Sequence, residues 1–478
     1  MKRFITVCIL LCCLFPIVQA KVDLPQLFAD NMVLQQQSDA ALWGKAAANA
    51  KVTITTTWSK SKTVVKADAD GRWFVRLATP AAGGPYEITF DDGDKLTLKN
   101  VLIGEVWICS GQSNMEMQMK GFTGQPVDGA TDLILTAKAS IPIRSCNLKR
   151  VKALEPQETC PATWYEHTPE GVNEASATAY FFAKKLYDVL QIPIGVINVS
   201  WGGTPIEAWM NPELLKKDFA SELKLGHLDT KVWPENNPHK APGVLYNGMM
   251  HSVVKFTAKG FIWYQGCDNR KRFEQYKRLQ PAFVQMLRDE WGNQDMGFYF
   301  TQIAPYNYKD AESPARYGGY MMWAQAQTLE MIPHSGMAAT HDVGEYACIH
   351  PADKKTVGDR LAYLALSNDY GYNLIDANPP IYESFKVEDG EALVKFKVGP
   401  MGLCPVSTEL DGFELAGEDG VFYPAKGRVY KDRKILRVRC PEVPNPVAVR
   451  YGMLNWSEAT VFNCSGIPVS PFRTDNWK

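Results

Sequence analysis

Residues 104–115 read Gly104-Glu105-Val106-Trp107-Ile108-Cys109-Ser110-Gly111-Gln112-Ser113-Asn114-Met115. An apolar, β-rich run stops abruptly in small polar residues, as a buried strand does at the edge of a sheet. The carboxyl edge of an open α/β sheet is where such folds bind their ligands. Ser113 is therefore a candidate nucleophile, and the backbone amides beside it can face a developing oxyanion. Serines at strand ends are common, so the rest of the chain must support this interpretation.

The chain of 478 residues divides by pattern into three regions. Residues 21–103 are predicted to form a β-rich domain, because short β-branched runs alternate with turn residues. Residues 104–370 alternate buried-type strands with helical stretches, which favours a mostly parallel sheet. Residues 371–478 return to β character. We therefore expect an α/β protein with a central domain between two β-rich, sandwich-like regions.

The individual elements follow from the period of the apolar residues. A helical period predicts helices, and β-branched or continuous apolar runs predict strands. The clearest expected elements are helices at 175–190, 275–291 and 354–366, and strands at 51–57, 86–90, 194–199, 260–264, 298–300 and 392–398.

The N-terminus has the pattern of a secretory signal. Lys2 and Arg3 precede an apolar stretch that reaches Val18, and residues 18–20 resemble a cleavage site. We expect residues 1–20 to be a signal peptide and the mature protein to be periplasmic or extracellular. The apolar stretch is shorter than a membrane span requires, and the sequence contains no second, longer one.

Composition limits the possible partners. The formal net charge is −1 and no long basic run occurs, which argues against nucleic acid or an anionic membrane as the main partner. Eight cysteines follow the signal, and an even number permits disulfides in an exported protein. No Cys-x-x-Cys pair occurs, so a structural zinc site is not expected.

Four short polar blocks in the central region each end a strand or precede a helix, where chemistry-bearing side chains can converge. They are Gly111-Gln112-Ser113, Ser200 to Trp209, Trp263 to Asn269, and Asp342 to Pro351. If Ser113 is the nucleophile, His350 can take its proton as general base and return it to the leaving group. The candidate oxyanion or substrate-binding groups are the N–H of Gly203 and the side chains of Gln265, Asn269 and Gln112.

These blocks resemble the sialate O-acetylesterase family, a branch of the SGNH hydrolases. The similarity lies in Gly104 to Met115, Ser200-Trp201-Gly202-Gly203-Thr204, Trp263-Tyr264-Gln265-Gly266, Ile349 to Lys354 and the terminal Pro471-Phe472-Arg473-Thr474-Asp475. The resemblance implies a three-layer α/β/α catalytic domain and a serine carboxylic-ester hydrolase. It implies removal of acetyl groups from sugar hydroxyls, typically those of sialic acid, without metal or organic cofactor.

The chain departs from that family at the acid that orients the catalytic histidine. SGNH enzymes usually place an Asp three residues before this histidine, where the present chain has Ala347. Asp342 and Glu345 are the nearest candidates to replace it. A Ser-His dyad oriented by a backbone carbonyl is a further alternative.

Cysteine stands at two positions where the family commonly has an acid. They are Cys267 and Cys348, in blocks expected to meet at one site. We hypothesise a disulfide between them, since closing a loop of about 80 residues contributes roughly 4 kcal/mol in the entropic model. The alternative is two independent thiols.

Two other functions stay open at this point. The first is an esterase for other acetylated glycans such as xylan or pectin. The second is a carbohydrate-binding protein with weak catalysis, which the missing acid favours. Aromatic residues expected to line a sugar pocket are Trp107, Trp201, Trp209, Trp263 and Tyr264. A polar insertion, residues 211–245, is expected near the substrate.

Overall fold

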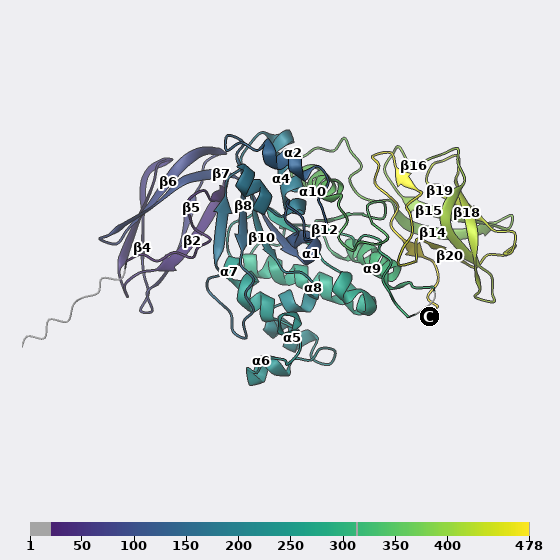
Figure 1. The fold of residues 1–478 in the computed structure, drawn as a ribbon, viewed down its shortest axis with the longest axis horizontal. Coiled ribbons are helices and arrows are strands. Elements are labelled where there is room, and N and C mark those ends of the chain that lie inside the picture. The colour runs from purple at the N-terminus through teal and green to yellow at the C-terminus, as the bar shows by residue number, and fades with distance from the viewer. Residues whose placement is uncertain (1–20, 312–313, 478) are drawn as a thin grey trace, which may run out of the picture.

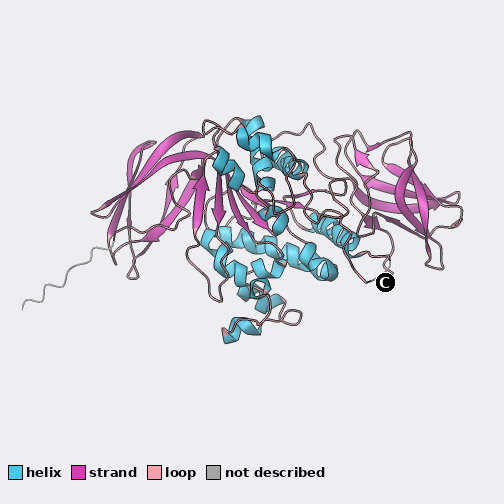
Figure 2. Cartoon of the chain, viewed as in Figure 1, coloured by secondary structure: helices cyan, strands magenta, loops and turns pink. Residues whose placement is uncertain are grey.

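The computed structural model describes residues 21–311 and 314–477, so the expected signal peptide lies outside the described residues. The molecule is elongated, with β-rich regions at its two ends and a mixed helical and sheet domain between them (Figures 1 and 2). Among the described residues, no helix combines the length and the apolar character needed to cross a membrane.

The central domain is built on the main path of an eleven-stranded sheet, with strand order β13-β12-β11-β7-β10-β8-β9. Neighbouring strands on this path are parallel, except that β9 is antiparallel to β8. The strands are β7 (Lys95–Gly111), β8 (Ile143–Leu148), β9 (Ala162–Tyr165), β10 (Ile194–Ser200), β11 (Gly260–Tyr264), β12 (Gly297–Thr301) and β13 (Ser335–Ala338). Because the chain fills one side of β7 first and then the other, β7 marks a topological switch point.

Helices cover both faces of this sheet. On one face α4 and α10 pack on each other and on β10, β12 and β13. On the other face lie α7 and α8 (Figure 1). The helices are α1 (Ser113–Glu116), α2 (Ala130–Leu135), α3 (Pro169–Glu174), α4 (Ala177–Leu190), α5 (Pro212–Asp218), α6 (Gly226–Thr230), α7 (His251–Val253), α8 (Phe273–Trp291), α9 (Tyr317–Met331) and α10 (Lys354–Asp369). This is the predicted three-layer α/β/α arrangement.

The strand β7 joins the N-terminal region to the central domain. Its first half pairs with β6 in an antiparallel ladder, and its second half lies between β10 and β11. The strand therefore runs without interruption across the predicted domain boundary at residues 103 and 104. Every residue from Val101 to Gly111 is buried, as expected for a strand covered on both faces.

The two end regions consist of strands. The N-terminal strands are β1 (Val33–Gln35), β2 (Asp39–Lys45), β3 (Lys51–Thr56), β4 (Ser59–Lys66), β5 (Arg72–Ala78) and β6 (Gly83–Asp91). The C-terminal strands are β14 (Ile381–Glu388), β15 (Glu391–Lys397), β16 (Leu403–Cys404), β17 (Leu410–Ala416), β18 (Phe422–Val429), β19 (Ile435–Arg439), β20 (Ala448–Tyr451), β21 (Phe462–Asn463) and β22 (Phe472–Arg473). Seven of these form one sheet in the order β14-β15-β19-β18-β17-β20-β22.

All three predicted helices form, and two of them begin with a side-chain cap. Ser176 accepts a hydrogen bond from the Ala179 N–H at the start of α4, and Asp353 accepts one from Thr356 at the start of α10. The helix α9, which the sequence analysis did not anticipate, contains Gly318 and Gly319. A Cβ at Gly319 would lie 2.6 Å from the backbone of Met453, so glycine allows this helix to approach the C-terminal segment closely.

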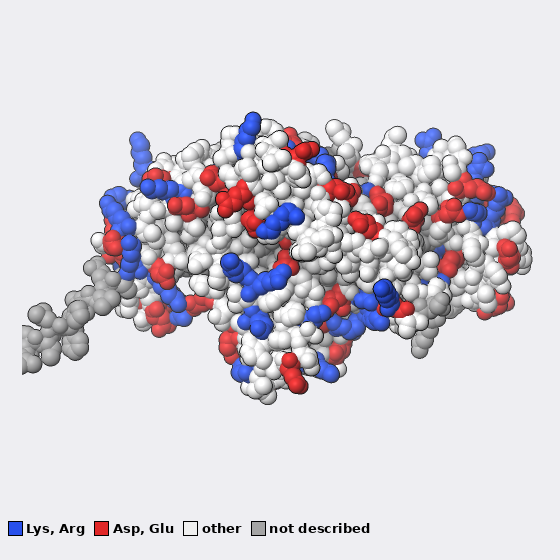
Figure 3. Space-filling view, in the orientation of Figure 1, with Lys and Arg blue, Asp and Glu red and all other residues white. Residues whose placement is uncertain are grey.

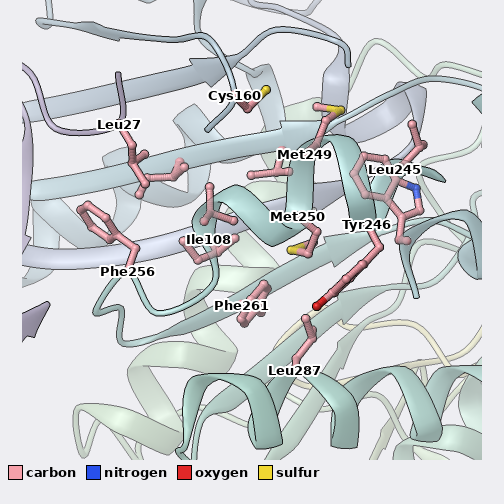
Figure 4. Close-up of a cluster of buried hydrophobic side chains, with 14 of the residues drawn as sticks. Leu27, Ile108, Cys160, Leu245, Tyr246, Met249, Met250, Phe256, Phe261 and Leu287 are labelled. Atoms are coloured by element: carbon pink, nitrogen blue, oxygen red, sulfur yellow. The ribbon is translucent and has the colours of Figure 1, made fainter. Parts of the chain in front are cut away.

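The core beneath the sheet is apolar and closely packed. Figure 4 shows Phe261 of β11 between Met250, which precedes α7, and Leu287, which belongs to α8. Ile108 of β7 lies nearby. Four of the aromatic side chains expected in a sugar pocket are instead part of the apolar cores that cover the two faces of the sheet. They are Trp107, Trp209, Trp263 and Tyr264, each at most 1% exposed. Only Trp201 of that group is partly exposed.

Candidate active site

Ser113 lies at the end of the apolar strand, as predicted: β7 ends at Gly111, Gln112 follows, and Ser113 is the first residue of α1. The turn depends on Gly111, whose φ of 142° favours glycine. A Cβ at that position would lie 2.2 Å from the carbonyl oxygen of Tyr264 in the neighbouring strand. The chain can therefore bend sharply beside β11 and present the Ser113 hydroxyl at the carboxyl edge of the sheet.

His350 contacts Ser113 directly, although 237 positions separate the two residues. Its Nε2 accepts a hydrogen bond from Ser113 Oγ at 2.8 Å. Its Nδ1 lies 2.7 Å from Oε1 of Gln125, which can only accept, so Nδ1 carries the proton. Burial, together with the nearby charge of Lys354, lowers the pKa of His350 to about 4. The imidazole is therefore neutral at pH 7 and in the tautomer that a general base requires.

Gln125 occupies the place of the orienting acid, which the sequence analysis assigned to Asp342 or Glu345. That prediction is wrong, because both carboxylates have other partners. Asp342 forms a bidentate ion pair with Arg360, at 2.6 and 2.7 Å. Glu345 accepts a hydrogen bond from the Ala352 N–H at 2.6 Å. A neutral amide oxygen orients the histidine but supplies less stabilisation to the imidazolium than a carboxylate does.

The loop after β10 packs against the nucleophile. A Cβ at Gly202 would lie 3.1 Å from the Cβ of Ser113, and the Gly202 N–H donates to Oε2 of Glu116 at 2.8 Å. The next residue, Gly203, has a φ of 65°. Among the described residues, the backbone N–H groups of Ser113 and Gly203 have no hydrogen-bond partner. Two amides are therefore available beside the Ser113 hydroxyl, as an oxyanion hole requires.

The side-chain amide of Gln265 is used inside the protein. Its Nε2 donates to the carbonyl oxygen of Thr204 at 3.1 Å and to Oδ1 of Asn269 at 2.7 Å. Both N–H bonds are thereby engaged, so the prediction of Gln265 as an oxyanion donor is wrong. Its role in this arrangement is to hold the loop that carries Gly203.

Asn269 and Gln112 both accept hydrogen bonds from backbone N–H groups. Asn269 is fully buried; its Oδ1 accepts from the Ile206 N–H at 2.9 Å and its Nδ2 donates to Oε2 of Glu207 at 2.9 Å. Oε1 of Gln112 accepts from the Gly266 N–H at 3.1 Å. The contacts of Asn269 do not match its predicted role, because they fix the loop after β10. For Gln112 only Oε1 is engaged among the described residues, so its role in binding stays a prediction.

The cysteines are free thiols throughout the described part of the chain. The predicted Cys267–Cys348 disulfide is therefore not formed. The Cys348 thiol donates to the carbonyl oxygen of His350 at 3.2 Å. Burial raises the pKa of the Cys267 thiol. Each sulfur thus occupies a buried or partly buried position next to the site without a covalent link.

A buried lysine ties the histidine loop to the nucleophile. Nζ of Lys354 donates to Oδ1 of Asn114 at 2.7 Å and to the carbonyl oxygen of Pro351 at 2.6 Å. Nδ2 of Asn114 donates to the carbonyl oxygen of Ile349 at 3.0 Å. Burial lowers the pKa of Lys354 to about 7. Asn114 and Lys354 both fall inside the motifs quoted from the sequence, whereas Gln125 falls in none.

Comparison with known proteins gives a consistent result. Residues 103–367 match the family model described as carbohydrate esterase, sialic acid-specific acetylesterase. Human sialate O-acetylesterase is 30% identical over 396 residues, which cover 75% of this chain and 73% of the human protein. The mouse sialate O-acetylesterase is 29% identical over 511 residues and covers 93% of each chain.

A solved structure agrees with the relatives. The crystal structure of a carbohydrate acetylesterase from Xanthomonas citri superposes with a TM-score of 0.86 at 32% identity, covering 96% of this chain and 100% of that chain. The similarity therefore extends over both β-rich ends as well as the central domain. The chain belongs to the sialic acid-specific acetylesterase family of carbohydrate esterases, and it is a hydrolase that acts on ester bonds.

Proposed function

We propose that this protein removes acetyl groups from the hydroxyls of O-acetylated sialic acids through an acetyl-enzyme formed on Ser113. The observation that carries the proposal is the 2.8 Å hydrogen bond between Ser113 Oγ and a neutral His350, near two backbone amides that have no partner in the described part of the chain. A nucleophile, a base and donors for an oxyanion are the parts that acyl transfer needs.

The chemistry follows from this geometry in two steps. Ser113 Oγ attacks the acetyl carbonyl while His350 Nε2 takes its proton, and the N–H groups of Ser113 and Gly203 stabilise the oxyanion. The imidazolium then protonates the leaving sugar hydroxyl. In the second step His350 removes a proton from water, which attacks the acetyl-enzyme, and acetate leaves from Ser113.

Gln125 keeps this cycle working at a reduced rate. Its Oε1 accepts the Nδ1–H of His350, so the ring keeps its orientation when Nε2 gains and loses a proton. Being neutral, the amide adds little to the stability of the imidazolium. A low pKa also makes His350 a weak base, so we infer a slower enzyme than one with a carboxylate at this position.

We propose that the sugar ring binds beside Trp201, with its carboxylate near Arg150 and Lys240. Trp201 stacks on His239 with ring centroids 5.2 Å apart, and the Arg150 guanidinium lies 5.8 Å from the Trp201 ring. Nζ of Lys240 would lie 4.0 Å from a Cβ at Gly203. Arg150 also pairs with Glu116 at 2.5 Å and Lys240 with Asp268 at 2.7 Å, so a sugar carboxylate would share these two cations with carboxylates of the protein. Lys240 comes from the insertion 211–245, as expected for a segment near the substrate.

The experiment is a comparison of substrates. The kcat/KM for acetate release is measured with 9-O-acetylated sialic acid, acetylated xylan and acetylated pectin. The proposal predicts the highest value for the sialic acid, and a raised KM for that substrate alone when Lys240 is changed to Met. Higher values for xylan or pectin would contradict the substrate and leave the esterase chemistry intact.

A glycan-binding protein with weak catalysis is the second candidate, and the neutral Gln125 is the observation that favours it. It predicts binding of acetylated sialic acid without acetate release. The hydrogen bond between Ser113 and His350 weighs against it, because a disabled site has no need for this contact.

We also propose that the protein is exported and loses residues 1–20. The charged start, apolar stretch and small-residue end of this segment support the proposal. Fractionation of the producing cells and sequencing of the mature N-terminus test it. A cytoplasmic protein that retains Met1 would contradict it.

A further inference from the structure

A groove on the C-terminal sheet is rich in cations, which make up half of the residues that line it. It has a volume of about 610 Å³ and follows β18, β19 and the turn between them. Its lining includes six basic side chains, namely Lys426, Arg428, Lys431, Arg433, Arg437 and Arg439. In Figure 3, basic and acidic side chains gather at the end of the molecule that carries β18 and β19 in Figure 1.

The strand register places like charges opposite one another. Lys426 of β18 pairs with Arg439 of β19, and Arg428 pairs with Arg437. The residue pair between them, Gly427 and Val438, faces the buried side. Like charges directly opposite across a ladder destabilise it. Two such pairs in succession therefore cost stability unless anions neutralise the face.

The protein neutralises only half of these cations itself. Arg437 pairs with Glu391 at 3.0 Å, Arg439 pairs with Glu409 at 3.1 Å, and Lys426 pairs with Asp411. Within residues 21–311 and 314–477, no carboxylate pairs with the other three, which are all exposed. These are Arg428, Lys431 and Arg433. The groove thus holds three cations free for an external anion.

One further feature gives the groove a fixed shape. The Arg437 guanidinium lies over the Tyr430 ring, 4.4 Å from its centroid, and its Nε is buried without a hydrogen-bond partner in the described structure. Stacking on an aromatic ring holds a guanidinium in one orientation. Together with its ion pair to Glu391, this stacking fixes Arg437 as one wall of the groove, so external carboxylates are left to the exposed cations.

We propose that this groove binds an acidic glycan, with its carboxylates on Arg428, Lys431 and Arg433. Glu391 and Glu409 also line the groove, so its positive charges are separated from one another. Separated charges suit a glycan that carries one carboxylate on each sugar. A nucleic acid carries a denser line of charge and would meet Glu391 and Glu409 as well. The groove rests on the proposed function, since a polymer of sialic acid is both the substrate and the ligand.

Binding at this groove would act on catalysis through local concentration. The C-terminal sheet lies at one end of the elongated molecule, whereas α1 and Ser113 lie in the central domain (Figure 1). A polymer held at the groove keeps its other residues near the catalytic site, which raises their effective concentration there. A single acetylated sugar cannot contact both places and gains nothing from the groove.

The test uses fluorescence anisotropy with labelled, non-acetylated α2,8-linked polysialic acid, and neutral dextran as the control polymer. The test variant is R428Q/K431Q/R433Q, in which all three side chains are exposed. The matched control is K60Q/K62Q/K66Q on the exposed face of β4, which removes the same charge elsewhere. We expect the Kd for polysialic acid to rise about tenfold in the test variant and to stay near the wild-type value in the control.

Three results would overturn the proposal. The first is equal affinity of the test variant and the wild-type protein for polysialic acid. The second is an equal loss in both variants, which would indicate general charge attraction. The third is binding of dextran or duplex DNA with the affinity of polysialic acid. Thermal melting of each variant shows whether the fold is intact.

Kinetics separates this proposal from the proposed function. The test variant is expected to keep wild-type kcat/KM for 4-nitrophenyl acetate and for monomeric 9-O-acetylated sialic acid, and to show a raised KM for the O-acetylated polymer only. If no acetylated sialic acid is hydrolysed, the proposed function fails, while binding of the non-acetylated polymer still reports on the groove.

Discussion

Replacing Gln125 with Glu places a carboxylate where the structure has a neutral amide. The two side chains have nearly the same shape, and Oε1 of Gln125 is 2.7 Å from Nδ1 of His350. An opposite charge at this distance raises the pKa of a histidine by about 1–3 units. Starting from about 4, the pKa of His350 in the variant should lie between about 5 and 7.

The pH profile of kcat/KM reports this shift. His350 acts as a base only when it is neutral, so activity is lost as the pH falls through its pKa. The wild-type protein should therefore keep its activity down to a pH near 4, and the Glu variant should lose activity 1–3 units higher. At pH values above this loss of activity, the variant should be faster by about tenfold, because the carboxylate stabilises the imidazolium in the transition state.

Two further variants complete the experiment. Gln125→Ala removes the acceptor of the Nδ1–H and should lower kcat by about tenfold, the value of one hydrogen bond. Thr123→Glu adds a charge to an exposed position of the same loop and should leave the acid limb near its wild-type pH. An unchanged acid limb in Gln125→Glu, together with full activity in Gln125→Ala, would refute the assignment of Gln125 as the residue that positions His350.

Three other predictions concern the framework of the site. Asp342→Asn should lower the melting temperature, because Arg360 loses its ion pair. The pH at which kcat/KM falls in acid should stay unchanged, and a shift of that pH would show that Asp342 does orient His350. Gly111→Ala should destabilise the fold by at least about 2 kcal/mol in urea unfolding, since its Cβ would lie 2.2 Å from the Tyr264 carbonyl oxygen; wild-type stability would contradict the described turn. Burial lowers the pKa of Lys354 to about 7, so between pH 7 and about 10 the unfolded chain binds more protons than the folded one. The free energy of unfolding should therefore rise over that range relative to Lys354→Met, and parallel curves for the two proteins would contradict a buried, depressed lysine.

The sequence predicts the fold well because the sheet and its helices follow regular patterns. The strand 260–264 is predicted with the observed bounds, and the predicted helix 354–366 becomes α10, Lys354–Asp369. The long strand β7 was harder to predict. It belongs to two ladders at once, and only its second half lies in the apolar run that the pattern marks.

The site was predictable where a residue ends a strand and unpredictable where a loop returns to it. Ser113 and the Gly202-Gly203 turn follow β7 and β10, so the sheet fixes their positions. Gln125 reaches His350 only through the path of the loop between α1 and α2, which depends on packing far from its own sequence. An amide in a loop has no local signature of function.

The wrong predictions share a second physical cause. Asp342 lies close to His350 in sequence, yet Arg360 on α10 provides a better partner for its carboxylate. Gln265 has the donor that an oxyanion needs, yet Thr204 and Asn269 use both of its N–H bonds. Residue type and spacing identify candidates, whereas competing partners in the folded protein decide which of them stay available.

The most direct test of the account is acetate release from 9-O-acetylated sialic acid by three proteins: the wild type, Ser113→Ala and Ser110→Ala. Ser110 is a buried serine of β7 whose hydroxyl donates to the Val199 carbonyl oxygen at 2.5 Å, so it controls for the loss of a serine from the same strand. The account predicts release by the wild-type protein and by any Ser110→Ala protein that folds, and none by Ser113→Ala. Acetate release by a folded Ser113→Ala protein at the wild-type rate would contradict it.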